Sequence, residues 1–175
     1  TAVAVGSHSV KCWVGYMDAQ QNTLSESSTK DRRRVRGGLL TLCHSRVVCL
    51  STASVEVWDA NARTRNSVLV SDAVPTTGHA SAYGTMLAVA FQDEFRLWAM
   101  EQRSAKMQET ACIRRRHREA IMCVGFAPNG QYIASGSADS TIKIYCLHSF
   151  AEVATLSHPD MSNQGGVHCV EFSAC

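Results

Sequence analysis

One short pattern occurs four times along the chain and constrains the fold more than any other feature of the sequence. Each copy alternates apolar and polar residues and ends in an aromatic residue; the copies are Ser9–Trp13, Ser54–Trp58, Glu94–Trp98 and Thr141–Tyr145. The terminal aromatics lie 45, 40 and 47 residues apart, and all three tryptophans of the chain stand at these places. Alternation with a period of two is typical of a β-strand that buries one face, so the chain repeats a unit built of strands.

A more apolar segment precedes each of these strands and is expected to be an inner strand covered on both faces. These segments are Ala2–Val5, Val47–Leu50, Met86–Phe91 and Tyr132–Ser135. A repeat of about 40 to 45 residues with four short strands predicts one blade of a β-propeller. The predicted blades cover approximately residues 1–29 (partial), 37–72, 79–113 and 117–157, and residues 167–173 are predicted to be the first strand of a following or ring-closing blade. Residues 1–175 as a whole are predicted to be a single propeller segment.

Residues 117–157 form the clearest unit. A strand at 120–126 leads into Asn129-Gly130, which predicts a two-residue hairpin turn with positive φ at both residues. Strands at 132–136, 141–147 and 152–156 follow. The unit is therefore predicted to form four antiparallel strands in a meander.

The same unit resembles a repeat of the WD-repeat family nearly residue by residue. The matching residues are His117, the runs 124–130 and 133–139, and Ile142–Tyr145. The resemblance implies an all-β fold, a WD-repeat-like β-propeller of four-stranded antiparallel blades in an incomplete ring. It also implies a structural hydrogen-bonded tetrad of a His, a Ser or Thr, an Asp and a Trp, and the matching positions are His117, Ser135, Asp139 and Tyr145.

The other units depart from the family pattern. Unit 79–113 keeps His79, Asp93 and Trp98 but has Val89 where Ser135 would align, and unit 37–72 keeps only the pair Trp58-Asp59. Propellers of the family commonly have seven blades, which need roughly 300 residues. Because the chain opens at Thr1 without an initiator Met, we expect it to be part of a longer propeller whose rest is absent here or comes from another chain.

Two predicted inter-blade loops are rich in arginine, and the topology of a propeller would set both on one face. The candidate partner-binding residues are Arg32, Arg33, Arg34 and Arg36 in the first loop and Arg114, Arg115, Arg116 and Arg118 in the second. Guanidinium groups bind carboxylates and phosphates in a bidentate manner, so this face is suited to an acidic or phosphorylated peptide or to a nucleic-acid backbone. The alternative is a pair of solvated loops that bind nothing.

Neither the composition of the chain nor its motifs indicate an enzyme. The net charge of +2 is too small to indicate a nucleic-acid or membrane partner by itself. The eight cysteines have no C-x-x-C spacing and several lie in apolar runs, which predicts reduced thiols in an intracellular protein, cytoplasmic or nuclear. No apolar run approaches the roughly 18 residues of a membrane span. We predict no catalytic residue, no metal site and no cofactor, because the sequence has no Gly-rich phosphate loop, H-E-x-x-H or G-x-S-x-G motif.

The leading hypothesis is a non-catalytic WD-repeat scaffold that mediates protein–protein interactions within a multi-subunit intracellular complex. One alternative is a propeller that binds RNA or ribonucleoprotein backbones through its arginine-rich loop face, although no aromatic residues are interleaved with the arginines for base stacking. Another is a substrate adaptor of a ubiquitin ligase. Some family members in that role carry Arg two residues after the Trp-Asp pair, whereas Ala60 and Asn61 follow Trp58-Asp59 here and the next arginine is Arg63.

Overall fold

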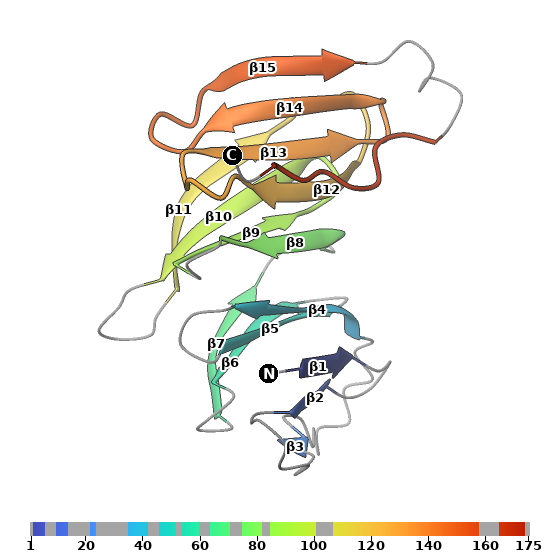
Figure 1. Cartoon of the computed structure of the whole chain (residues 1–175). Helices are drawn as coiled ribbons and strands as arrows, with labels where there is room; N and C mark the ends of the chain where they lie inside the picture. Colours follow the sequence, from blue (N-terminus) through green and yellow to red (C-terminus); the bar gives the residue numbers. More distant parts are fainter. Residues whose placement is uncertain are drawn as a thin grey trace. The chain divides into compact units, whose positions relative to one another are not determined.

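The computed structural model describes residues 2–5, 10–13, 22–23, 35–41, 46–51, 54–59, 64–70, 75–81, 85–100, 107–157 and 165–173. Every regular element within these ranges is a β-strand, and all strand pairs are antiparallel (Figure 1). The predicted all-β class is therefore confirmed. The chain divides into two compact units, Thr1–Val74 and Pro75–Cys175, which are described separately below.

The first unit contains two sheets. The first consists of β1 (Ala2–Val5), β2 (Val10–Trp13) and β3 (Asn22–Thr23), in the order β1-β2-β3. The second consists of β4 (Val35–Thr41), β5 (Arg46–Ser51), β6 (Ser54–Asp59) and β7 (Thr64–Val70), in the order β4-β5-β6-β7. Alternate residues of β5 and β6 are buried, as the period of two requires; they are Val48, Leu50, Val55 and Val57.

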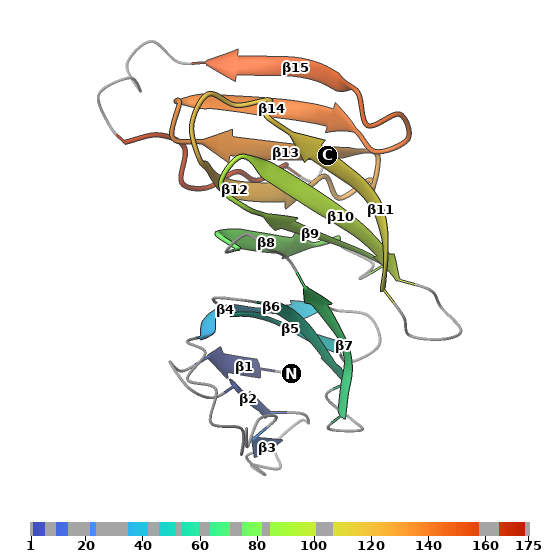
Figure 2. The same cartoon turned by 180° about the vertical axis from the view of Figure 1, so that it is seen from behind.

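The second unit contains two four-stranded sheets (Figures 1 and 2). One consists of β8 (Thr77–Ala80), β9 (Met86–Ala90), β10 (Glu94–Met100) and β11 (Met107–Arg114). The other consists of β12 (Ile121–Phe126), β13 (Tyr132–Ser137), β14 (Thr141–Cys146) and β15 (Glu152–Ser157). Their strand orders follow the sequence, so each sheet is a meander.

The four repeated aromatics occupy equivalent strand positions. Each lies opposite an apolar residue of the preceding strand; the pairs are Trp13 with Ala2, Trp58 with Val47, Trp98 with Leu87, and Tyr145 with Ile133. In the three four-stranded sheets, the register with the outer strand shifts immediately before the aromatic residue. Because a β-bulge recurs at one place in three sheets, the sequence repeat is a structural repeat.

The core of the second unit lies between its two sheets. Phe95 and Leu97 of β10 are fully buried, as is Ile133 of β13. The Phe95 and Tyr145 rings meet edge to face, with centroids 5.3 Å apart. Burial of each large apolar side chain contributes about 1.5 to 3 kcal/mol, so this contact between sheets is a main source of stability for the unit.

Three local predictions differ from the structure. Gly130 has a φ of +70° but Asn129 does not have a positive φ, and Gly130 N donates to Ala127 O at 3.0 Å. The predicted two-residue turn is therefore wrong: the connection is a longer turn that ends in a left-handed glycine.

His79 is also not the counterpart of His117. It lies within β8 opposite Ala88, a position that Gly125 occupies in β12 opposite Ala134. Its Nδ1 accepts a hydrogen bond of 3.4 Å from Phe126 N. His79 therefore joins two first strands instead of standing in the loop before its own sheet.

Residues 167–173 form no strand in the structure. The segment nonetheless lies against the last sheet, because Val167 N donates to Ser137 O at 2.9 Å and Cys123 Sγ donates to Val167 O at 3.4 Å. A strand is defined by pairing, and among the described residues no strand pairs with this segment. The prediction of a first strand there is not met.

Candidate functional site

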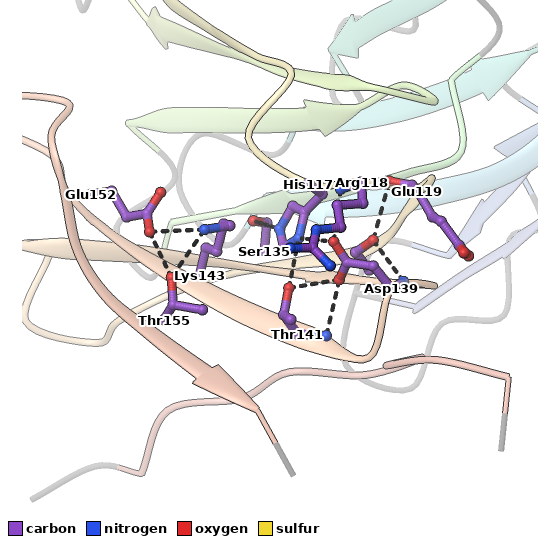
Figure 3. A network of polar contacts seen from close by, with 10 residues as sticks. His117, Arg118, Glu119, Ser135, Asp139, Thr141, Lys143, Glu152 and Thr155 are labelled. Carbon is purple, nitrogen blue, oxygen red and sulfur yellow. Dashed lines mark hydrogen bonds and ion pairs between the residues drawn. The ribbon is translucent and has the colours of Figure 1, made fainter. Parts of the chain in front are cut away.

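A buried network of polar side chains connects the loop before β12 to the turn between β13 and β14 (Figure 3). His117 Nε2 lies 2.7 Å from Ser135 Oγ, and His117 Nδ1 lies 3.2 Å from Asp139 Oδ2. Only 1% of the His117 side chain and 7% of the Asp139 side chain are exposed, and Ser135 exposes none of its surface. The structure therefore brings together three of the four predicted tetrad residues.

Asp139 is the centre of this network. Its Oδ2 accepts a bond of 2.8 Å from Arg118 N, and its Oδ1 accepts bonds of 3.0 Å from Thr141 N and 2.6 Å from Thr141 Oγ1. Burial by itself would raise the pKa of Asp139, but these hydrogen bonds together with the charge interaction with His117 lower it to about 2. Asp139 is therefore ionised, and its oxygens are hydrogen-bonded.

The His117 ring is neutral at physiological pH. Burial lowers its pKa below the ordinary value of 6.5, and Asp139 opposes that shift without reversing it. Because an ionised carboxylate accepts only, the proton of the neutral ring lies on Nδ1, which donates to Asp139, while Nε2 accepts from the Ser135 hydroxyl.

A serine, a histidine and an aspartate in this order also occur in nucleophilic catalysis. A nucleophile must reach its substrate, however, and Ser135 is fully buried in the second strand of its sheet. The arrangement in this conformation fixes a loop against a turn and presents no reactive atom.

Tyr145 does not complete the predicted tetrad. Its Oη is buried without a hydrogen-bond partner among the described residues. Burial raises the pKa of Tyr145 to about 12, and the nearby Ser135 hydroxyl acts in the opposite direction without a bond of acceptable geometry. Thr141 takes the fourth place instead, since its Oγ1 lies 3.0 Å from His117 Nδ1. The spacing of Asp139 and Thr141, two residues apart in a turn, is the signal that sequence reasoning missed.

Further hydrogen bonds anchor the loop that carries the second group of arginines. Ala138 N donates to Ala120 O at 2.9 Å, and Ser137 Oγ donates to Glu119 O at 3.1 Å. With the bond from Arg118 N to Asp139, three successive loop residues are fixed by their backbone atoms. The loop is held by the same turn that holds His117.

The candidate arginines differ in their surroundings. Arg114 Nε forms an ion pair of 2.5 Å with Glu94 Oε2, and Arg115 Nε forms a looser one of 3.9 Å with Asp93 Oδ2. Arg116 and Arg118 are exposed, and neither guanidinium forms an ion pair within the part of the chain described here. Arg114 is the last residue of β11 and not a loop residue, which corrects the predicted boundary of this loop as well. Of the three arginines within the loop, Arg116 and Arg118 are the two that form no ion pair with a described residue.

The first group of arginines is largely outside the described residues. Arg32, Arg33 and Arg34 lie there, as do Ala60 and Arg63 after the Trp58-Asp59 pair. Arg36 lies in β4 and not in a loop, because the strand begins at Val35. That placement corrects the predicted loop boundary.

Glu94 organises the polar residues of the other sheet. Arg96 Nε donates to Glu94 Oε1 at 2.6 Å, while Arg114 binds Oε2 of the same carboxylate. Burial would raise the pKa of Glu94, but the two arginines, Arg96 first, bring it below its ordinary value. The Arg96 guanidinium also lies 5.4 Å from the centroid of the Phe91 ring.

Neither a metal centre nor a membrane helix is found in the described ranges. No three His, Cys, Asp or Glu residues within them gather closely enough to coordinate an ion. The described residues also contain no helix of the length and hydrophobicity that would span a bilayer.

Repeated antiparallel meanders with an aromatic residue at one fixed position of the third strand define a β-propeller architecture. The solved β-propeller domain of Cps50 (Swd1) from Myceliophteria thermophila is similar, with a TM-score of 0.72 at 14% sequence identity. The similarity covers 90% of this chain and 56% of that chain, and at this identity it concerns the fold.

Within that fold, residues 110–146 match the family described as "WD domain, G-beta repeat". The matched range runs from β11 to the end of β14 and contains the His117, Ser135, Asp139 and Thr141 network. Residues 110–146 are therefore a repeat of the WD type within a chain that has a β-propeller fold.

Two curated relatives are similar over shorter ranges. The "WD repeat, SAM and U-box domain-containing protein 1" of Danio rerio is 39% identical over 70 residues, which are 39% of this chain and 13% of that protein. The "Notchless protein homolog" of Arabidopsis thaliana is 46% identical over 33 residues, 19% of this chain and 7% of that protein. The matched ranges thus span only a small part of either relative.

Proposed function

We propose that this chain belongs to a non-catalytic scaffold that holds protein subunits together in an intracellular complex, and that the loop at residues 115–118 is one of its contacts. The observation that carries this proposal is the exposure of Arg116 and Arg118 on a loop whose backbone is fixed by Asp139 and its neighbours. A contact residue on a fixed loop loses less conformational entropy on binding than one on a free loop.

The buried network supports a scaffold over an enzyme. Its Ser, His and Asp residues are satisfied by one another and have almost no exposed surface. The polar groups that remain available to a partner are exposed side chains of loops and strand edges. Exposed polar side chains of this kind are suited to binding a protein partner.

Charge distribution favours a protein partner over a nucleic-acid backbone. Glu119 is exposed beside Arg118, and Asp93 pairs with Arg115, so negative groups alternate with the positive ones along this surface. A polyphosphate chain requires several unopposed cations. An acidic or mixed-charge protein segment fits the alternation better, and the nucleic-acid alternative predicts a steep dependence of binding on salt.

The test is affinity capture with the whole chain, compared with an R116S/R118S variant and a Q108E/Q131E control. Gln108 and Gln131 are exposed, so the control lowers the net charge by the same two units at other surfaces. We expect wild type and the control to retain a protein complex after nuclease treatment and R116S/R118S to lose most of it. Retention that disappears with nuclease, or equal retention by all three proteins, would contradict this function for the loop.

A further inference from the structure

The outermost strand of the last sheet has an exposed, apolar free edge. β15 pairs with β14 on one side, and among the described residues no strand pairs with its other side. Val153 and Leu156 on this strand are 54% and 51% exposed. Among the side chains whose exposure the structure describes, nearly all of them in the second unit, Met122 is the only other exposed large hydrophobic one. Exposed apolar surface is therefore concentrated on one strand edge.

β15 also lacks the usual protection of a free edge. Proteins protect such edges with Lys or other charges, with Pro, or by keeping the strand very short. β15 has six residues, and its one charged residue is Glu152. That carboxylate accepts bonds of 2.8 Å from Lys143 Nζ and 2.6 Å from Thr155 Oγ1, so it is engaged by its own sheet.

The equivalent strand of the neighbouring sheet is protected. β11 exposes Gln108, Glu109 and Thr110 along its middle and has no exposed large hydrophobic residue. The register bulge falls on Thr110 in β11 and on Val153 in β15. At that shared position, Thr110 Oγ1 donates to Leu97 O at 3.1 Å, whereas β15 presents a half-exposed valine. The bulge is common to both edges, and the side chains distinguish them.

We propose that β15 is a self-association edge, where the strand pairs antiparallel with β15 of a second copy of this chain. A two-fold axis through Thr155 sets Ala154 opposite Leu156 of the other copy, and this apolar pair occurs twice on one face of the joined sheet. Val153 then lies opposite Ser157, so no charged residues of the two strands meet. The strand is self-complementary in this register, as a two-fold interface requires.

The expected dimer is weak. Six residues from each copy form a small contact, well below the roughly 1,200 Å² that stable interfaces bury. Association should therefore depend on protein concentration, and the dimer should be populated only at high protein concentration.

The test measures molar mass by sedimentation over roughly a hundredfold range of concentration. Wild type should rise from the monomer mass of 19.0 kDa toward twice that value. V153K/L156K should stay monomeric over the whole range, since two lysines restore the edge protection. Q108K/Q131K, which adds the same charge at other exposed positions, should associate as wild type does.

Hydrogen exchange of wild type gives a second measurement that needs no variant. Protection of residues 152–157 should increase with concentration, while protection of β11 should not change. The proposal is overturned if wild type is monomeric throughout, if V153K/L156K associates as strongly as wild type, or if the Q108K/Q131K control dissociates to the same degree.

Discussion

The two sheets of the second unit share a backbone register but fill the same interior positions with different chemistry. By register, Glu94 and Arg96 of β10 correspond to Thr141 and Lys143 of β14, and Val89 corresponds to Ser135. In the last sheet, neutral His117 links Ser135 to an ionised Asp139 through hydrogen bonds of 2.7 and 3.2 Å. In the neighbouring sheet, ion pairs between a carboxylate and two arginines take the place of this network.

This difference shows that the repeated backbone does not depend on one particular polar network. The bulge before the aromatic and the apolar contact opposite it are common to both sheets. The hydrogen-bonded version is closed off from water, whereas Arg114 in the ionic version is 62% exposed. A closed network is intolerant of losing a member, and an open one can replace a lost partner with water.

The largest effect is expected for Asp139→Ala. It removes the acceptor for His117, for Thr141 and for Arg118 N, and leaves the partly buried donors of His117 and Thr141 unsatisfied. We expect the free energy of unfolding to fall by about 3 kcal/mol. Urea denaturation followed by tryptophan fluorescence measures it. A loss equal to that of a typical surface substitution would contradict the closed network.

The second prediction concerns pH. Asp139 has a folded pKa of about 2 against an ordinary value of 3.8, so its stabilisation, about 2 kcal/mol, is present above pH 4 and is lost as pH falls toward 2. The lowered pKa of His117 acts in the same direction, with stability lost as pH falls below its ordinary value of 6.5. Unfolding measured at successive pH values should show both losses in wild type and only the His117 loss in Asp139→Asn. An unchanged acid profile in that variant would count against the network.

Glu94→Gln tests the ionic sheet. Because Arg114 is largely exposed and Arg96 retains its position over the Phe91 ring, both arginines keep access to water or an aromatic partner. We expect a loss of only about 1 kcal/mol. Denaturation at low and at high salt checks this, and the difference from wild type should shrink as salt is added. A loss as large as that of Asp139→Ala would remove the distinction between the two sheets.

Tyr145→Phe should have the smallest effect. The Tyr145 Oη is buried and has no hydrogen-bond partner among the residues that the structure describes, while the ring packs against Phe95. Removing the hydroxyl therefore keeps the packing and removes an unsatisfied polar atom, so stability should stay within about 0.5 kcal/mol of wild type or increase. The Ser135→Ala variant is the matched comparison, because its hydroxyl bonds to His117. Equal losses in both variants would mean that Tyr145 belongs to the network after all.

The sequence predicted the repeated aromatic positions correctly because strand alternation and Trp spacing are direct consequences of a meander repeated along the chain. It also identified His117, Ser135 and Asp139 through the family resemblance. His79 was misaligned because residue type was weighed without spacing: His79 precedes its aromatic by 19 residues and His117 by 28. Spacing to the aromatic is the check that distinguishes them.

Other features depend on partners that sequence alone does not reveal. In the sequence, Arg114 resembles a loop arginine. Its ion pair with Glu94 joins the last residue of β11 to the first residue of β10, and this pairing can be known only once the strand register is known. Likewise, Tyr145 fits the aromatic position by packing, yet its oxygen forms no hydrogen bond with a described residue, although the Ser135 hydroxyl is nearby. Hydrogen-bond direction and ion pairing depend on geometry at the scale of an ångström, which residue patterns do not specify.

The central claim is that a closed network with neutral His117 fixes the loop that exposes Arg116 and Arg118. Imidazole ¹⁵N NMR of His117 across a pH titration tests it most directly. We expect a proton on Nδ1 and none on Nε2, and a ring that titrates only below the ordinary pKa of 6.5. A proton on Nε2, or a ring that titrates near that value as an exposed histidine does, would contradict it.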